Sequence, residues 1–412
     1  MSNLKGKDFL IDKFDQYERA GTWSSIYHRL MVESNRQEKS LKLSCKSAFS
    51  IRNVEKNRYR DVAPWDNCRI MLKEVDDDET DYINASPVSV PGTQRRYILS
   101  QGPLEETCND FWKMCWENKC RGIIMLNKIV EKGHMKDGCR IPPAGCAEYY
   151  PTVDGENEIE FHAFKVQLIE EKEQANYIVR RIKLTKTKTG ETHEVVHLQY
   201  TEWPDFGCPQ STKHFLEFLQ DCRGRGLMTE SVDDAPPIVH CSAGIGRTGT
   251  FIVCDSILDM LEHGHDANMD PEALIVELRK SRMGLIQTPQ QLRFCWMAIV
   301  DWIHNRENPS GTESDTASDE DEERAEDRPG LAGTGDSPDH ERKRIHETEA
   351  ELDDRLAKRR AMVARMVAKQ RSNEEKRSRY GGWLLGVPPL YLAAAGAVAA
   401  SSLFLYFYTK GR

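Results

Sequence analysis

Hydrophobic positions in this chain change their spacing along its length. Apolar runs typical of strands occupy the middle of the chain, and helical spacing dominates the stretch that follows. This segregation predicts an α+β domain over residues 1–305, with a central twisted mixed sheet flanked by helices. The predicted strands are Arg96–Ser100, Gly122–Leu126, Glu160–Leu168, Ile178–Thr185, Glu194–Tyr200 and Ile238–His240. The predicted helices are Lys7–Met31, Cys108–Glu117, Thr212–Cys222, Gly249–Leu261, Pro271–Lys280 and Pro289–His304.

After His304 the apolar pattern is lost. Residues 305–340 contain twelve acidic and three basic residues and few large apolar side chains. Such a segment buries too little surface to offset its ordering entropy, so residues 306–340 are predicted to form an acidic disordered linker. Ser318 precedes Asp-Glu-Asp-Glu and is either a target for an acid-directed kinase or part of an unmodified solubilising linker.

Residues 341–379 regain helical spacing and carry thirteen basic and eight acidic residues. A narrow apolar stripe predicts a charged juxtamembrane helix, and three interpretations stay open. The helix forms a coiled coil, lies on a membrane surface, or stands alone in solvent. The stripe consists of Ile345, Leu352, Leu356, Val363 and Val367.

The most apolar segment of the chain lies near its end. Leu390–Tyr408 contains no charged residue, and a helix of this length spans roughly 28 Å, close to the hydrocarbon thickness of a bilayer. The N-terminal residues lack the apolar core of a secretory signal. We therefore expect a tail anchor over residues 383–408, with the core span at 390–408 and the main domain in the cytosol. A buried C-terminal helix is the alternative, which the absence of a polar face disfavours.

Charge and cysteine spacing argue against a nucleic-acid-binding protein and against a zinc protein. The formal net charge of −9 arises largely in the acidic linker, so net charge does not favour a nucleic-acid partner. The twelve cysteines show no zinc-ligand spacing, and in a cytosolic chain they are expected to be reduced. We expect neither a metal nor another cofactor.

Candidate chemistry lies at the end of the last predicted strand. Residues 236–250 read as an apolar strand, a loop of small residues, and a helix that begins near Arg247. Backbone N–H groups of Ser242, Ala243, Gly244, Ile245, Gly246 and Arg247 can then converge at a helix N-terminus, which is a favourable arrangement for phosphate oxygens. Gly244 and Gly246 permit a close approach of backbone to ligand.

Cys241 precedes this loop. The amides, the helix dipole and Arg247 would stabilise its thiolate, which is the form that acts as a nucleophile. Arg247 can hold two phosphate oxygens at once, and Thr248 is placed to donate a hydrogen bond to the departing sulfur. An activated thiolate is also a target for peroxide.

The stretch from His240 to Gly249 resembles the signature of the classical non-receptor protein tyrosine phosphatases, and the resemblance extends over roughly residues 5–303. The acidic linker and apolar tail are similar to the endoplasmic-reticulum-anchored subgroup that includes T-cell phosphatase. The resemblance implies the α/β phosphatase type of fold, with the catalytic domain facing the cytosol. The other matching motifs are Lys56–Val62, Asp81–Ala85, Gln101–Pro103, Trp203–Gly207 and Gln287–Gln291.

The same resemblance implies roles for further residues. Asp205 would protonate the tyrosyl oxygen and later activate water, which Gln287 would orient with help from Gln291. Tyr59 would stack on the substrate ring and set the depth of the pocket, and Asp61 would bind the peptide backbone. The resemblance also implies that Val62, Ala243, Ile245 and Phe206 form the apolar walls of the pocket. Glu131 would hold Arg247, and Lys136 would reach toward Asp205. Trp203 would support the site, and His240 belongs to the signature itself.

Two departures from the family pattern stand out. The run from Lys136 to Pro143 lacks the aromatic-proline pair usual there. Some members also have an arginine near the position of Met31 that helps bind a second phosphotyrosine, and Met31 cannot form an ion pair. We therefore expect no strong second site, although Arg279 and Arg282 are present.

The sequence favours an active phosphotyrosine-specific phosphatase that damps tyrosine-kinase signalling. The expected substrates are receptor and cytosolic tyrosine kinases or their adaptors. The alternatives are a dual-specificity or lipid phosphatase, and a membrane-tethered phosphotyrosine-binding pseudophosphatase.

Overall fold

A computed structural model gives the arrangement of the chain. It describes residues 2–73, 79–129, 145–153, 155, 157–204, 207–209, 211–264 and 270–307, with backbone alone for 2–5, 135–136 and 139–140. An eight-stranded sheet has the order β1-β2-β10-β3-β9-β8-β7-β6, and β4 pairs with β5 separately. The strands are β1 (Ala85–Ser89), β2 (Arg96–Ser100), β3 (Gly122–Met125), β4 (Met135–Lys136), β5 (Cys139–Arg140), β6 (Glu158–Glu160), β7 (Phe164–Glu173), β8 (Tyr177–Lys186), β9 (Thr192–Tyr200) and β10 (Ile238–His240).

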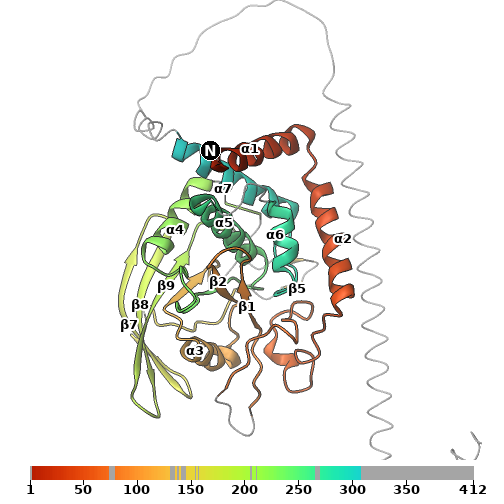
Figure 1. The fold of residues 1–412 in the computed structure, drawn as a ribbon. Helices are drawn as coiled ribbons and strands as arrows, with labels where there is room; N and C mark the ends of the chain where they lie inside the picture. The colour runs from red at the N-terminus through yellow and green to blue at the C-terminus, as the bar shows by residue number, and fades with distance from the viewer. Residues whose placement is uncertain are drawn as a thin grey trace, which may run out of the picture. The chain divides into compact units, whose positions relative to one another are not determined.

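Strand β10 lies inside the sheet. It pairs in parallel with β2 on one side and β3 on the other. Strands β6 to β9 pair antiparallel with one another, whereas β9 pairs in parallel with β3, and β7 and β8 extend as a long hairpin (Figure 1). The carboxyl end of β10 is therefore held from both sides, and this end carries His240 and then Cys241.

Helices cover both faces of the sheet, which confirms the predicted mixed fold with a central sheet between helices. Figure 1 shows α5 among α4, α6 and α7, while α3 lies apart from this group. The helices are α1 (Ser2–Ala20), α2 (Trp23–Leu41), α3 (Cys108–Glu117), α4 (Thr212–Gly224), α5 (Gly246–His263), α6 (Pro271–Leu278) and α7 (Pro289–Glu307), with short 3₁₀ turns η1 (Val54–Lys56) and η2 (Glu105–Thr107).

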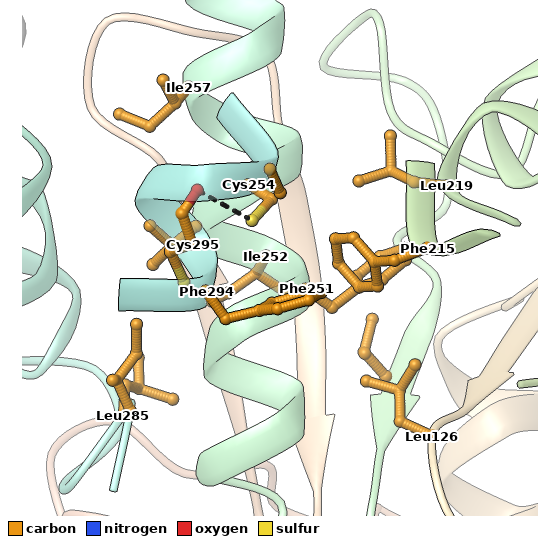
Figure 2. Packing of buried hydrophobic residues seen from close by; sticks show 14 of the residues in the cluster. Leu126, Phe215, Leu219, Phe251, Ile252, Cys254, Ile257, Leu285, Phe294 and Cys295 are labelled. Carbon is orange, nitrogen blue, oxygen red and sulfur yellow. Dashed lines mark hydrogen bonds between the residues drawn. The ribbon is translucent and has the colours of Figure 1, made fainter. Parts of the chain in front are cut away.

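Alternation along the strands separates two apolar clusters. One joins residues such as Leu99 and Val239 to α4, α5 and α7, and the other joins Ile98 and Ile238 to α3. Figure 2 shows part of the first cluster, where Phe251 lies close to Phe215. Successive side chains of a strand point to opposite faces, so each inner strand contributes to both clusters.

Two predicted elements were wrong in their continuity. The predicted helix Lys7–Met31 is two helices, because Gly21 adopts φ 58° and ends α1. The N–H of Thr22 donates to Tyr17 O and that of Gly21 to Glu18 O, a Schellman arrangement that closes the helix.

The predicted strand Glu160–Leu168 is likewise split into β6 and β7. Phe161 and Phe164 exchange backbone hydrogen bonds across a two-residue turn. The chain therefore reverses where its apolar spacing alone suggested continuation. Strand β1 and the short pair β4–β5 were not predicted.

The C-terminal predictions fall beyond the described part of the chain. The acidic linker, the juxtamembrane helix and the apolar span at 390–408 all lie outside it. Among the helices that are described, none combines the length and apolar character needed to cross a bilayer.

Candidate active site

The loop after β10 curves tightly around the Cys241 thiol. Cys241 is buried, and the N–H of Gly244 donates to its Sγ at 3.2 Å. Gly244 has φ 70°, and a Cβ there would lie 2.1 Å from Ser100 O, so backbone would have to move. Glycine is required here by both its conformation and the space available.

The first turn of α5 follows immediately. Ile245 is its N-cap and makes no side-chain cap. The first N–H groups of a helix have no partner within the helix, and the dipole there favours an anion. The start of α5 therefore places helix N-terminal N–H groups beside the thiol.

Arg282 holds the loop from behind. Its Nε donates to Gly244 O at 2.7 Å and its Nη2 to Ala243 O at 3.2 Å. Nη2 also donates to Asn84 Oδ1 at 2.9 Å. Burial lowers the pKa of Arg282 to about 10, so it stays charged at neutral pH. Because these carbonyls face Arg282, the neighbouring amides are free to face the opposite side.

The segment around Tyr59 is tied directly to this loop. Ser242 Oγ donates to Gly145 O at 3.1 Å, so the Tyr59 hydroxyl, at 2.9 Å, donates to Ser242 Oγ. Gly102 N donates to Ser242 O at 2.9 Å, while Arg58 donates to Gly102 O. The motif at residues 101–103 therefore bridges the predicted substrate-binding segment and the thiol loop.

Arg247 reaches two other segments. Its Nη1 donates to Leu126 O at 3.2 Å and its Nη2 to Pro204 O at 3.3 Å. Trp203 is buried, and its Nε1 donates to Gly207 O at 3.2 Å. The Trp-Pro segment is thus anchored beside the arginine.

Gln287 and Gln291 lie against the start of α5. A Cβ on Gly246 would be 2.4 Å from Gln287 Oε1 and 3.0 Å from Gln291 Nε2. Gln287 N donates to Gln291 Oε1 at 2.8 Å. Within the described residues, the buried Thr248 Oγ1 has no hydrogen-bond partner. This hydroxyl is available to a group that arrives at the site.

His240 is fully buried below the loop. Its Nε2 lies 2.7 Å from the Tyr149 hydroxyl, and its Nδ1 lies 3.3 Å from Cys241 O. Burial lowers the pKa of His240 to about 4, so the ring is neutral at pH 7. It therefore supports the loop as a neutral imidazole.

The other predicted site residues divide into two groups. Val62, Ala243 and Ile245 are buried beside these segments, and Asp61 is exposed. Asp205, Phe206, Glu131 and the side chain of Lys136 lie outside the described residues, as does most of the atypical 137–143 loop. Their predicted roles stay predictions.

Arg279 is buried and engaged by protein atoms. It donates to Ser34 Oγ at 2.9 Å and to the Leu285 and Ile286 carbonyls at 2.7 and 2.9 Å. Its Nη1 also lies 3.2 Å from Met31 Sδ. The expected weakness of a second phosphotyrosine site stays a prediction.

Sequence comparisons place this geometry in a family. The protein-tyrosine phosphatase family matches residues 53–301. The chain belongs to the protein-tyrosine phosphatase family. Mouse and human tyrosine-protein phosphatase non-receptor type 2 are 42% and 41% identical over 289 residues, which is 70% of this chain and 66% and 64% of theirs. The Drosophila non-receptor type 61F enzyme is 38% identical over 71% of this chain and 51% of its own length. The match thus spans slightly less than two thirds of the mouse and human relatives.

Membership in this phosphatase family confirms the resemblance inferred from the signature. Sequence reasoning did not assign Arg282, Tyr149 or His197 to the site. A polar residue within a largely apolar stretch of sequence could have indicated these side chains, but only the fold shows which groups they contact. The described part of the chain contains no cluster of three or more side chains suited to a metal ion, and no disulfide joins its cysteines.

Proposed function

We propose that the chain hydrolyses phosphotyrosine in proteins through a cysteinyl-phosphate on Cys241. The observation that carries this proposal is the thiol enclosed by a loop whose Gly244 N–H donates to Sγ at 3.2 Å. Arg282 holds the loop carbonyls away from that side, which leaves amides for the phosphate oxygens. Membership in the family supports the same chemistry.

In the first step, the Cys241 thiolate attacks phosphorus and the bond from phosphorus to the tyrosyl oxygen breaks. Asp205 gives its proton to that oxygen, and tyrosine leaves as a neutral phenol. Arg247 and the loop amides stabilise the charge on the phosphoryl oxygens as they flatten. The Thr248 hydroxyl donates to the sulfur.

In the second step, water oriented by Gln287 attacks phosphorus and the bond to sulfur breaks. Asp205 takes the proton from this water, and Cys241 returns to the thiolate as phosphate leaves. The length of the tyrosyl side chain lets phosphate reach a deep thiol while Tyr59 contacts the ring. Phosphoserine is too short for this arrangement, which supports specificity for phosphotyrosine.

Substitution of the nucleophile tests the mechanism. We expect Cys241→Ser to lower kcat for a phosphotyrosine peptide by about 10⁴-fold or more, because removal of a covalent nucleophile has effects of this order. Cys68→Ser, outside the loop, is the control.

Asp205→Ala should lower kcat by roughly 10²–10⁴-fold while substrate still binds.

Three results would contradict the proposal. They are full turnover by Cys241→Ser, comparable rates on phosphoserine and phosphotyrosine peptides, and binding without turnover in the unmodified chain. The second would favour a dual-specificity enzyme and the third a pseudophosphatase. Trapping with Asp205→Ala would identify substrates, which we expect among tyrosine kinases and their adaptors.

We further propose that Leu390–Tyr408 tethers the enzyme to the endoplasmic reticulum membrane with the catalytic domain in the cytosol. The support is nineteen consecutive residues without charge, preceded by basic residues. Val398→Arg adds a charge at mid-span, with an insertion cost of about 3 kcal/mol, and should release protein from membranes in alkaline extraction. Ala332→Arg in the acidic segment is the control, and equal retention of both variants would refute the tether.

A further inference from the structure

A buried line of polar groups connects β8 to the backbone of Cys241. Arg180 Nη1 lies 3.4 Å from His197 Nδ1, its direct cross-strand neighbour on β9. His197 Nε2 lies 2.8 Å from the Tyr149 hydroxyl, which lies 2.7 Å from His240 Nε2. His240 Nδ1 then meets Cys241 O at 3.3 Å. The side chains in this line are all buried.

The two ends of the line fix the direction of every hydrogen bond in it. A guanidinium only donates and a carbonyl only accepts. Arg180 therefore donates to His197 Nδ1, and His240 Nδ1 donates to Cys241 O. Burial lowers the pKa of both imidazoles, so each carries one N–H. His197 Nε2 must then donate to Tyr149, and Tyr149 must donate to His240 Nε2.

This direction has a consequence for the anion-binding loop. The peptide between Cys241 and Ser242 is planar and trans, so its C=O and N–H point in opposite directions. A donor that fixes Cys241 O toward His240 aims the Ser242 N–H away from His240. That N–H begins the row of amides beside the thiol.

A second series of hydrogen bonds starts from the same Arg180 guanidinium. Arg180 Nη1 donates to Gln199 Oε1 at 3.0 Å, and Gln199 Nε2 donates to Asn127 O at 3.1 Å. Asn127 follows Leu126, whose carbonyl accepts from Arg247. Arg180 thus supports the backbone next to both the nucleophile and the phosphate-binding arginine.

Two contacts hold the Arg180 side chain in place. Its Nε donates to Glu171 Oε2 at 2.5 Å, and its guanidinium lies 4.5 Å from the centre of the Tyr150 ring. A buried charge requires such partners, and removing one partner of a buried ion pair is strongly destabilising, whereas replacing the whole pair by apolar residues often costs little stability. An arginine in this position therefore calls for an explanation beyond packing.

We propose that Arg180 is a positioning residue for the active site. Through His197, Tyr149 and His240 it orients the Cys241–Ser242 peptide. Through Gln199 it fixes the segment that Arg247 contacts. The catalytic consequence rests on the proposed phosphatase function, whereas the hydrogen-bond direction does not.

Histidine tautomers test this direction in the unmodified full-length chain. Two-bond ¹H–¹⁵N correlation spectra of ¹⁵N-histidine-labelled protein distinguish Nδ1–H from Nε2–H rings. We expect His240 as the Nδ1–H tautomer and His197 as the Nε2–H tautomer. Arg180→Met removes the first donor, so His197 should shift toward the Nδ1–H form.

The catalytic effect is measured on the same variant. Arg180→Met should lower kcat/KM about tenfold, less than the ~10²–10³-fold loss of an entire oxyanion-hole donor, because the amide is misaligned rather than removed. The inhibition constant of inorganic vanadate should rise by a similar factor. Arg180→Lys, which keeps a donor and a charge, should recover part of the loss.

Arg181→Met is the matched control. Arg181 is the next residue on β8, points to the opposite face, and pairs with Glu194 at 3.1 Å on the exposed surface. It should change neither the tautomers nor the vanadate constant by more than twofold.

The rate at which iodoacetate alkylates Cys241 at a fixed pH of 7 provides a further readout. It should fall in Arg180→Met and not in Arg181→Met. The charged and titratable groups that face the polar line come from five places, namely Glu171 on β7, Arg180 on β8, Cys108 on α3, Cys146, Glu148, Tyr149 and Tyr150 in the segment before β6, and Arg58 near His240. None of these except Arg180 is altered by the substitution.

The proposal is overturned if His240 is the Nε2–H tautomer in the unmodified chain. It is also overturned if folded Arg180→Met keeps the parent tautomers and vanadate constant. A chain without phosphatase activity would still give the tautomer and alkylation results, so failure of the proposed function is distinguishable. If Arg180→Met does not fold, the tautomers of the unmodified chain still decide the outcome.

Discussion

The two faces of the central sheet support the same loop by different means. On the face covered by α4, α5 and α7, the contacts are apolar and aromatic, as between Phe251 and Phe215 (Figure 2). On the α3 face, apolar side chains surround a line of polar groups from Arg180 to His240. Apolar packing fixes where α5 lies, whereas directional hydrogen bonds fix how the peptide next to the thiol is turned. Position and orientation are thus separate contributions to the site.

The largest effect on stability should come from the apolar face. Phe251→Ala removes a fully buried ring and should lower the free energy of unfolding by about 3–5 kcal/mol. The kcat of the protein that remains folded should change little. Urea titration and active-site titration separate the two quantities. Phe49→Ala, at a half-exposed ring, should cost under about 0.5 kcal/mol, and a similar loss at both positions would undermine the comparison.

The polar face should make stability depend on pH. His240 has a pKa of about 4 in the folded chain because of burial, against about 6.5 when unfolded. The unfolded chain therefore binds more protons between these values, and stability present above pH 6.5 is lost as pH falls toward 4. The total for this group is about 3 kcal/mol, and His197 contributes in the same direction.

Denaturant midpoints between pH 7 and 4.5 test this dependence. Carboxylates also titrate in this range, so the informative quantity is the difference between variants. His240→Gln should start lower at pH 7 and decline less steeply than the parent. His304→Gln, at an exposed position, should parallel the parent. Parallel curves for His240→Gln would show that its burial does not create the dependence.

The smallest effect on stability should accompany a clear effect on catalysis. Tyr149→Phe removes one hydroxyl and leaves two buried ring nitrogens without it, which should cost about 1–3 kcal/mol. Because the line to Cys241 O is broken, kcat/KM should fall about tenfold, as expected for Arg180→Met. Steady-state kinetics on a phosphotyrosine peptide would measure this. Tyr177→Phe at the start of β8 is the control, and an unchanged kcat/KM in Tyr149→Phe would remove the distinction between the faces.

Local patterns were sufficient for strands β2, β3, β8, β9 and β10 and for most helices. Strands Arg96–Ser100 and Ile238–His240 and helix Cys108–Glu117 have the predicted limits, because their apolar spacing and flanking residues act locally. The break at Gly21 was missed because apolar spacing continues through it, although glycine is the usual helix terminator. The turn before β7 was missed for the same reason.

The sequence by itself determined the chemistry of this protein. A strand, a loop of small residues around Cys241 and a following helix with Arg247 specify an anion site, because backbone donors at a helix N-terminus depend only on local structure. Tertiary structure decided which distant groups orient that site. Arg282 contacts the loop from the segment after α6, and Arg180 on β8 is connected to it through buried hydrogen bonds. No sequence spacing encodes those contacts. The orientation of the loop peptides depends on hydrogen bonds between segments that only the folded sheet brings together.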